Sequence, residues 1–105
     1  MDVGNIFESI PNAMKDEVIE SLIESKVVKI ERIISKGHAS PKAGWYEQDQ
    51  DEWVIILRGS AIIKFENTEP LSINEGGYIN IPAGTKHKVL WTDSEIETVW
   101  LAVHY

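Results

Sequence analysis

The residues GGYINIPAGTKH, at positions 76–87, carry the strongest fold signal in this chain. A short apolar run, 78–81, is followed by Pro82, Gly84 and then His87. Proline holds φ near the value that a turn requires, and glycine adopts positive φ without steric cost. The pattern therefore predicts a strand, a tight turn and a second strand that opens with a histidine. Such a turn can direct His87 inward from the rim of a sheet, where imidazole binds a metal or transfers a proton.

A second stretch, EWVIILRG at positions 52–59, is the expected partner of the first. An acidic residue, Glu52, leads an apolar strand that stops at Gly59. Both alternating faces of this strand are apolar, so we expect both of them to be covered. The functional prediction concerns what Glu52 and His87 do together.

Short segments rich in β-branched and aromatic residues follow one another through the rest of the chain. They are 27–34, 45–48, 52–57, 61–65, 71–73, 78–81, 87–91 and 98–105. About eight short strands with turn residues between them are typical of an antiparallel sandwich, jelly roll or small barrel, and not of βαβ units. We predict a β-barrel.

One helix is expected before the barrel. Pro11 suits a first helical turn, and charged residues occupy the face opposite an apolar stripe. The stripe consists of Met14, Val18, Ile19, Leu22 and Ile23. This spacing predicts an amphipathic helix over 12–25 that packs on the barrel. It divides the chain into an N-terminal helical segment, 1–26, and a barrel domain, 27–105.

Length and charge limit the possible partners. The chain has 105 residues, which suits one domain, and 10 Lys and Arg against 17 Asp and Glu give a formal charge of −7. Phosphates of nucleic acids and of anionic membranes would be repelled, so neither is expected as a partner. The chain has no cysteine, and we find neither a signal peptide nor an apolar run of the ~20 residues that a membrane span needs. We therefore expect a cytoplasmic protein.

The two stretches together resemble the cupin family, the small double-stranded β-helix barrels of the jelly-roll class. The second cupin motif is G-x5-P-x-G-x2-H-x3-N, and the residues that match it in register are Gly76, Pro82, Gly84 and His87. Trp91 stands where the family often has Asn. In the first motif, G-x5-H-x-H-x3,4-E-x6-G, Glu52 and Gly59 match the last two positions. The resemblance implies an all-β jelly-roll barrel with the predicted helix outside it.

The sequence departs from the family in the first motif. Cupins that bind metal typically use both histidines of H-x-H, the glutamate, and the histidine of the second motif, but this chain has no H-x-H. Counting three residues back from Glu52 places Gln48 and Tyr46 at those positions. Counting four residues back places Glu47 and Trp45 there instead. The spacing leaves open which of the two sets faces inward.

The resemblance implies one divalent ion, Fe, Mn, Ni or Zn, held by His87, Glu52 and Gln48. One imidazole, one carboxylate and one amide form a poorer ligand set than the sets common for Fe(II) or Zn. Glu47 in place of Gln48 would favour a harder ion such as Mn²⁺. His104, near the chain end, could supply a further imidazole if its strand face points inward.

A pocket for a small molecule is expected in the barrel mouth. Its candidate residues are Tyr46, Glu47, Asn80, Trp91 and His104. The position of Asn80 usually faces into the barrel in cupins, and an amide between two isoleucines needs a partner when buried. Trp91 shares strand parity with His87, so it could form a wall of the pocket.

Two functions follow from these residues. One is a metal-dependent enzyme that acts on a small molecule at Glu52 and His87. The other is a metal-free module without catalytic activity, which binds or senses a small polar molecule held against Tyr46, Asn80, Trp91 and His87. A third, a metal-free enzyme, would use Glu52 as base and His87 as acid. We also predict a homodimer, because four tryptophans and the apolar outer face of 52–57 need cover.

Overall fold

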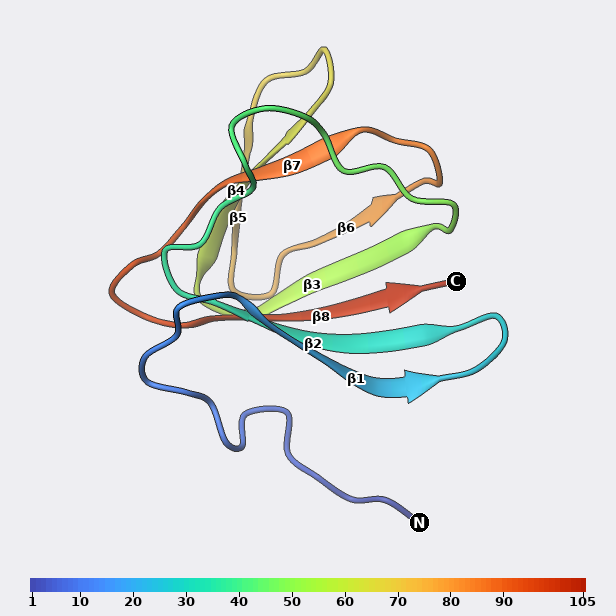
Figure 1. Ribbon diagram of the computed structural model, residues 1–105, viewed down its shortest axis with the longest axis vertical. Helices are drawn as coiled ribbons and strands as arrows, with labels where there is room; N and C mark the ends of the chain where they lie inside the picture. Colours follow the sequence, from blue (N-terminus) through green and yellow to red (C-terminus); the bar gives the residue numbers. More distant parts are fainter.

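The computed structural model describes residues 1–105 as two antiparallel sheets that form a jelly-roll barrel (Figure 1). The strands are β1 (Val18–Glu24), β2 (Lys29–Ser35), β3 (Glu52–Arg58), β4 (Ser60–Phe65), β5 (Leu71–Asn74), β6 (Tyr78–Ile81), β7 (His87–Thr92) and β8 (Thr98–His104). One sheet has the order β1-β2-β8-β3-β6, and the other has the order β5-β4-β7. The predicted all-β barrel is confirmed. The chain contains no helix with the length and apolar character needed to cross a membrane.

The core lies between the two sheets, on the inward faces of their strands. Its buried residues are Val54, Ile56, Ala61, Ile63, Ile73, Ile81, Trp100 and Ala102. On β3 the inward residues alternate with Trp53, Ile55 and Leu57, which are half-buried on the outer face. The inner face of β3 is therefore buried and its outer face is partly buried. The homodimer expected from the apolar outer face stays a prediction.

The predicted helix over 12–25 is wrong, because β1 occupies half of that range and the other half contains no helix. β1 pairs antiparallel with β2, and the register shifts between Ser21 and Ile23, where a β-bulge interrupts the ladder. Its β-branched residues favour an extended backbone, and β2 offers an open edge to pair with. The adjacent apolar pairs Val18–Ile19 and Leu22–Ile23 suggested a helical stripe. They are also compatible with a strand whose alternation is interrupted by a bulge.

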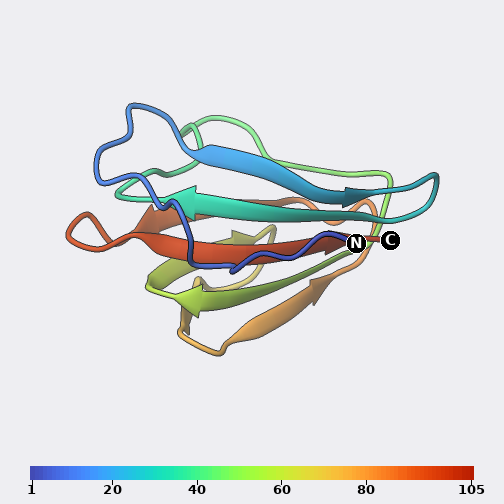
Figure 2. The same cartoon turned by 90° about the horizontal axis from the view of Figure 1, so that it is seen from below.

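The N-terminal segment crosses the outer face of the five-stranded sheet before β1 begins (Figure 2). Arg32, which is 5% exposed on the outer face of β2, holds it there. One guanidinium nitrogen donates to the carbonyls of Ile6 and Glu8 at 3.0 and 2.6 Å. The other nitrogen donates to both carboxylate oxygens of Glu20 at 2.8 and 2.9 Å. We call this set of bonds the Arg32 clamp.

Candidate functional site

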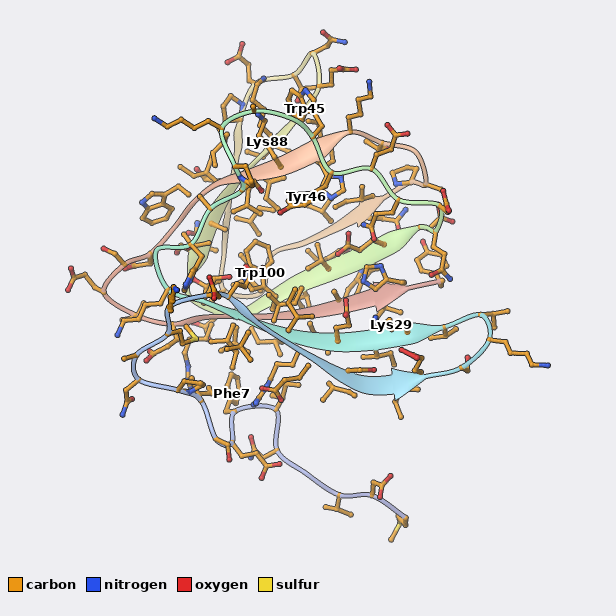
Figure 3. All side chains as sticks on the ribbon, in the orientation of Figure 1. Phe7, Lys29, Trp45, Tyr46, Lys88 and Trp100 are labelled. Atoms are coloured by element: carbon orange, nitrogen blue, oxygen red, sulfur yellow. The ribbon has the colours of Figure 1, made fainter.

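A cavity of about 490 Å³ lies inside the barrel and is lined by strands of both sheets. Residues 16–17 and 38–40, together with 46–48, complete its walls from outside the sheets. Figure 3 shows Tyr46 and Trp100 on one side of the five-stranded sheet and Phe7 on the opposite side. The cavity is in the size range of about 300–1,000 Å³ that is common for sites of small ligands.

Glu52 and His87 meet in this cavity. Each opens a strand, β3 in one sheet and β7 in the other, so the two side chains approach across the barrel. The distance from His87 Nε2 to Glu52 Oε1 is 3.8 Å, and the residues are 8% and 9% exposed, respectively. The sequence prediction that the two side chains share one site is therefore matched by their positions.

The turn before β7 determines which nitrogen of His87 faces the cavity. Gly84 has a φ of +77° and donates its N–H to the Gln48 carbonyl at 2.8 Å, which ties the turn to the strand-like segment beside it. His87 Nδ1 lies 2.9 Å from the Thr85 carbonyl. A carbonyl only accepts hydrogen bonds, so Nδ1 carries a proton, and in the neutral imidazole Nε2 therefore keeps its lone pair. Nε2 has no hydrogen-bond partner in the protein.

Gln48 completes the centre of the site. Its Nε2 donates to Glu52 Oε1, so Gln48, Glu52 and His87 lie in one cluster. Glu47 lies at the rim, exposed, although it also lines the cavity. Of the two registers left open by the sequence, the structure therefore has Gln48 pointing toward Glu52. Tyr46 is 54% exposed, and its ring centroid is 6.3 Å from that of His87.

A second pair of a carboxylate and an imidazole lies beside the first. His104 is opposite Glu52 on the ladder between β8 and β3, and it faces the cavity. Its Nε2 lies 2.8 Å from Glu31 Oε1, and both side chains are nearly buried. Sequence reasoning missed Glu31, although it shares strand parity with Ile33 and could have been assigned to the same inward face of β2.

Two predicted lining residues lie outside the cavity, contrary to expectation. Asn80 is exposed and accepts a hydrogen bond from the Tyr105 hydroxyl, because the inward face of β6 belongs to Ile81. Trp91 is 44% exposed. The pairing of β4 with β7 shifts next to Val89, and this irregularity reverses the parity of the residues that follow.

The segment before β1 supplies a wall that sequence reasoning also missed. Asp16 and Glu17 line the cavity. Glu17 accepts a hydrogen bond of 2.6 Å from the Ser35 hydroxyl, which in turn accepts one from Trp100 Nε1 at 3.2 Å. His38 is half-buried in the lining. These residues follow no motif, and only the path of the chain brings them together.

Comparison with known proteins identifies the family. Residues 32–104 match the cupin domain. The chain is a cupin. None of the curated proteins matches it in sequence.

Solved structures of other cupins agree with this assignment. A protein of Ralstonia eutropha JMP134, provisionally named a mannose-6-phosphate isomerase, is 47% identical over 99% of this chain and 97% of its own, with a TM-score of 0.96. A cupin superfamily protein of Desulfitobacterium hafniense DCB-2 is 19% identical over 90% of this chain and 82% of its own, with a TM-score of 0.74. An RmlC-like cupin of Methanocaldococcus jannaschii is 21% identical over 90% and 84%, with a TM-score of 0.71. The last two likenesses concern the fold alone.

Proposed function

We propose that this cupin binds a small polar molecule in its barrel cavity and that Glu52 and His87 transfer a proton to or from it. The observation that carries the proposal is the unpartnered Nε2 of His87, which lies 3.8 Å from the Glu52 carboxylate in a cavity of about 490 Å³. A lone pair on a nearly buried imidazole can accept a proton from a bound molecule. The imidazolium that forms would be stabilised by the neighbouring carboxylate.

The similarity to the Ralstonia protein supports proton transfer as the reaction type. That protein is 47% identical to this cupin and is provisionally named an isomerase of a phosphorylated sugar. Interconversion of an aldose and a ketose requires a base that removes the proton beside the carbonyl and an acid that returns it. Glu52 and His87 are the groups of this cupin best placed for those two roles.

Deuterium exchange tests the proposed function. In D₂O, wild-type protein is expected to catalyse the replacement of the C2 proton by deuterium in at least one of three sugars: mannose, mannosamine and mannose 6-phosphate. Proton NMR measures the rate as the loss of the C2 proton signal. Glu52→Gln and His87→Gln should each lower that rate by about 10²- to 10⁴-fold, because each removes one proton-transfer group. Glu69→Gln, which removes an exposed carboxylate outside the cavity, is the matched control and should exchange at the wild-type rate. Absence of exchange on all three sugars, or unchanged rates in both site variants, would overturn the proposal.

A second candidate function is a divalent-metal-dependent reaction at the same residues. The favourable observation is that the His87 Nδ1–H donates to a backbone carbonyl, an arrangement that commonly orients metal-binding histidines. The side chains fit such an ion only in part, because no group of three or more His, Asp or Glu residues converges. His87 Nε2 and Glu52 would hold the ion, with the Gln48 amide oxygen as a third ligand. A bound ion of this kind acts as a Lewis acid.

Elemental analysis separates the two candidates. If the metal is part of the function, protein purified without added metal should carry Fe, Mn, Ni or Zn near one equivalent, and both Glu52→Gln and His87→Gln should lose it. Two strong protein ligands predict weak binding, so the metal should also be removed by a mild chelator. Deuterium exchange that persists in the chelated wild type would reject the metal-dependent reaction and retain the metal-free one.

A further inference from the structure

Apart from three imidazoles, the acidic and basic side chains of the cavity lining are all carboxylates. The carboxylates among them are Asp16, Glu17, Glu31, Glu47 and Glu52. The imidazoles are those of His38, His87 and His104, and the lining contains no lysine or arginine. Because carboxylates in a recessed site act on a ligand with little screening, this lining disfavours an anion and favours a cation.

Basic residues near the cavity do not reverse this balance. Lys29 lies at the start of β2, where its ammonium is 3.3 Å from the second oxygen of Glu31 (Figure 3). Lys88 lies over the ring of Trp45 at 4.5 Å, outside the lining. Neither Asp16 nor Glu47 has a basic group within ion-pair distance, so these rim carboxylates keep their charge available to a ligand.

The polar groups deep in the cavity need hydrogen-bond donors. His87 is only 8% exposed, and its Nε2 is an unpartnered acceptor because Nδ1 already donates to the Thr85 carbonyl. Glu52 receives one hydrogen bond, from Gln48, on Oε1, which leaves Oε2 without a protein donor. A ligand that reaches this pair can donate hydrogen bonds to both of these free acceptors.

We infer that the small molecule bound by this cupin is an organic cation that carries a primary amine. The ammonium group supplies N–H donors to His87 and Glu52, and the rim carboxylates attract it into the cavity. A sugar phosphate could donate hydroxyl hydrogen bonds to the same groups, but its phosphate would bring negative charge among the carboxylates of the lining. The inference rests on the proposed function, because it names the class of molecule that the proposed site binds. This class differs from the sugar phosphate that appears in the name of the Ralstonia relative.

Three probes with the same carbon skeleton test the inference by titration calorimetry. At low salt and neutral pH, 1,4-diaminobutane should bind wild-type protein at least about tenfold more tightly than 1,4-butanediol, and succinate should not bind. Raising the salt concentration should weaken diamine binding, because the attraction is electrostatic. Glu47→Gln should weaken it about threefold, and Glu69→Gln, which removes the same charge from an exposed position outside the lining, should leave it unchanged. Glu47 is exposed, so its substitution does not threaten folding.

The outcomes distinguish the inference from the function on which it rests. Failure of the diamine to bind, or binding of the diol or succinate as tightly as the diamine, would overturn the inference. Deuterium exchange on mannose 6-phosphate faster than on mannosamine would overturn it as well, while the proton-transfer function would stand. Tight diamine binding with no exchange on any sugar would retain the cationic ligand and reject proton transfer on sugars.

Discussion

Gly59→Ala is expected to lower the free energy of unfolding by about 3 kcal/mol. Gly59 joins β3 to β4 with a φ of +92°, a conformation that side chains rarely adopt. A Cβ there would lie 2.7 Å from the Cα of Thr98 and 2.5 Å from its hydroxyl oxygen. The Cα belongs to the backbone of β8, so the clash cannot be relieved by turning a side chain. Backbone strain and overpacking therefore add together.

Gly76→Ala provides the comparison for this prediction. Gly76 has a similar φ of +84°, but no atom lies within 4 Å of its added Cβ. This variant should lose only about 1 kcal/mol, the cost of the backbone conformation alone. Denaturant unfolding of both variants beside the wild type measures the difference. Equal losses would show that φ, and not the approach of β8, requires glycine at position 59.

Arg32→Ala is expected to destabilise the fold by about 3 kcal/mol and to free the N-terminal segment. The guanidinium is 5% exposed, and its removal leaves two backbone carbonyls and a carboxylate without their charged donor. Residues 6–8 then have little to hold them on the sheet. Denaturant unfolding should report the loss of stability, and hydrogen exchange or proteolysis within 1–17 should report the release.

The control for the Arg32 clamp is Arg58→Ala. Arg58 also contacts the N-terminal segment, through the ring of Phe7 at 4.5 Å, but it is exposed. A cation–π contact at an exposed site contributes about 0.5–1 kcal/mol, so this variant should retain an ordered segment. Equal release in both variants would mean that the clamp is not what anchors it.

The sequence motifs predicted the part of the site that is built from local turns. Pro82 and Gly84 form a turn that aims His87 inward, and Glu52 opens the neighbouring apolar strand in the register that the motif requires. The two side chains meet because both motifs belong to one barrel. This much follows from spacing and from the conformational preferences of proline and glycine.

The remaining errors arose where tertiary pairing decides the outcome. The strand β1 looks helical in isolation, and only the open edge of β2 makes it a strand. Trp91 has the parity of His87 until an irregularity beside Val89 reverses it. A bulge of this kind depends on how two strands pair, so the sequence of either strand alone does not reveal it. Glu17 lies at the cavity in a hydrogen bond with the Ser35 hydroxyl, a contact between residues that no motif relates.

Asp16 and Glu17 show that part of the cavity entrance is supplied by a segment that is separate from the cupin domain. The family match begins at residue 32, whereas these carboxylates come from the stretch that precedes it. That stretch is joined to the barrel by contacts of Arg32, Ser35, Lys36 and His38. Ligand preference can therefore diverge among related proteins by exchange of one short piece of chain, while the barrel and its inner carboxylate and imidazole stay the same. Grafting residues 1–17 onto another cupin would transfer Asp16 and Glu17, provided that its barrel has counterparts of Arg32 and Ser35 to hold them.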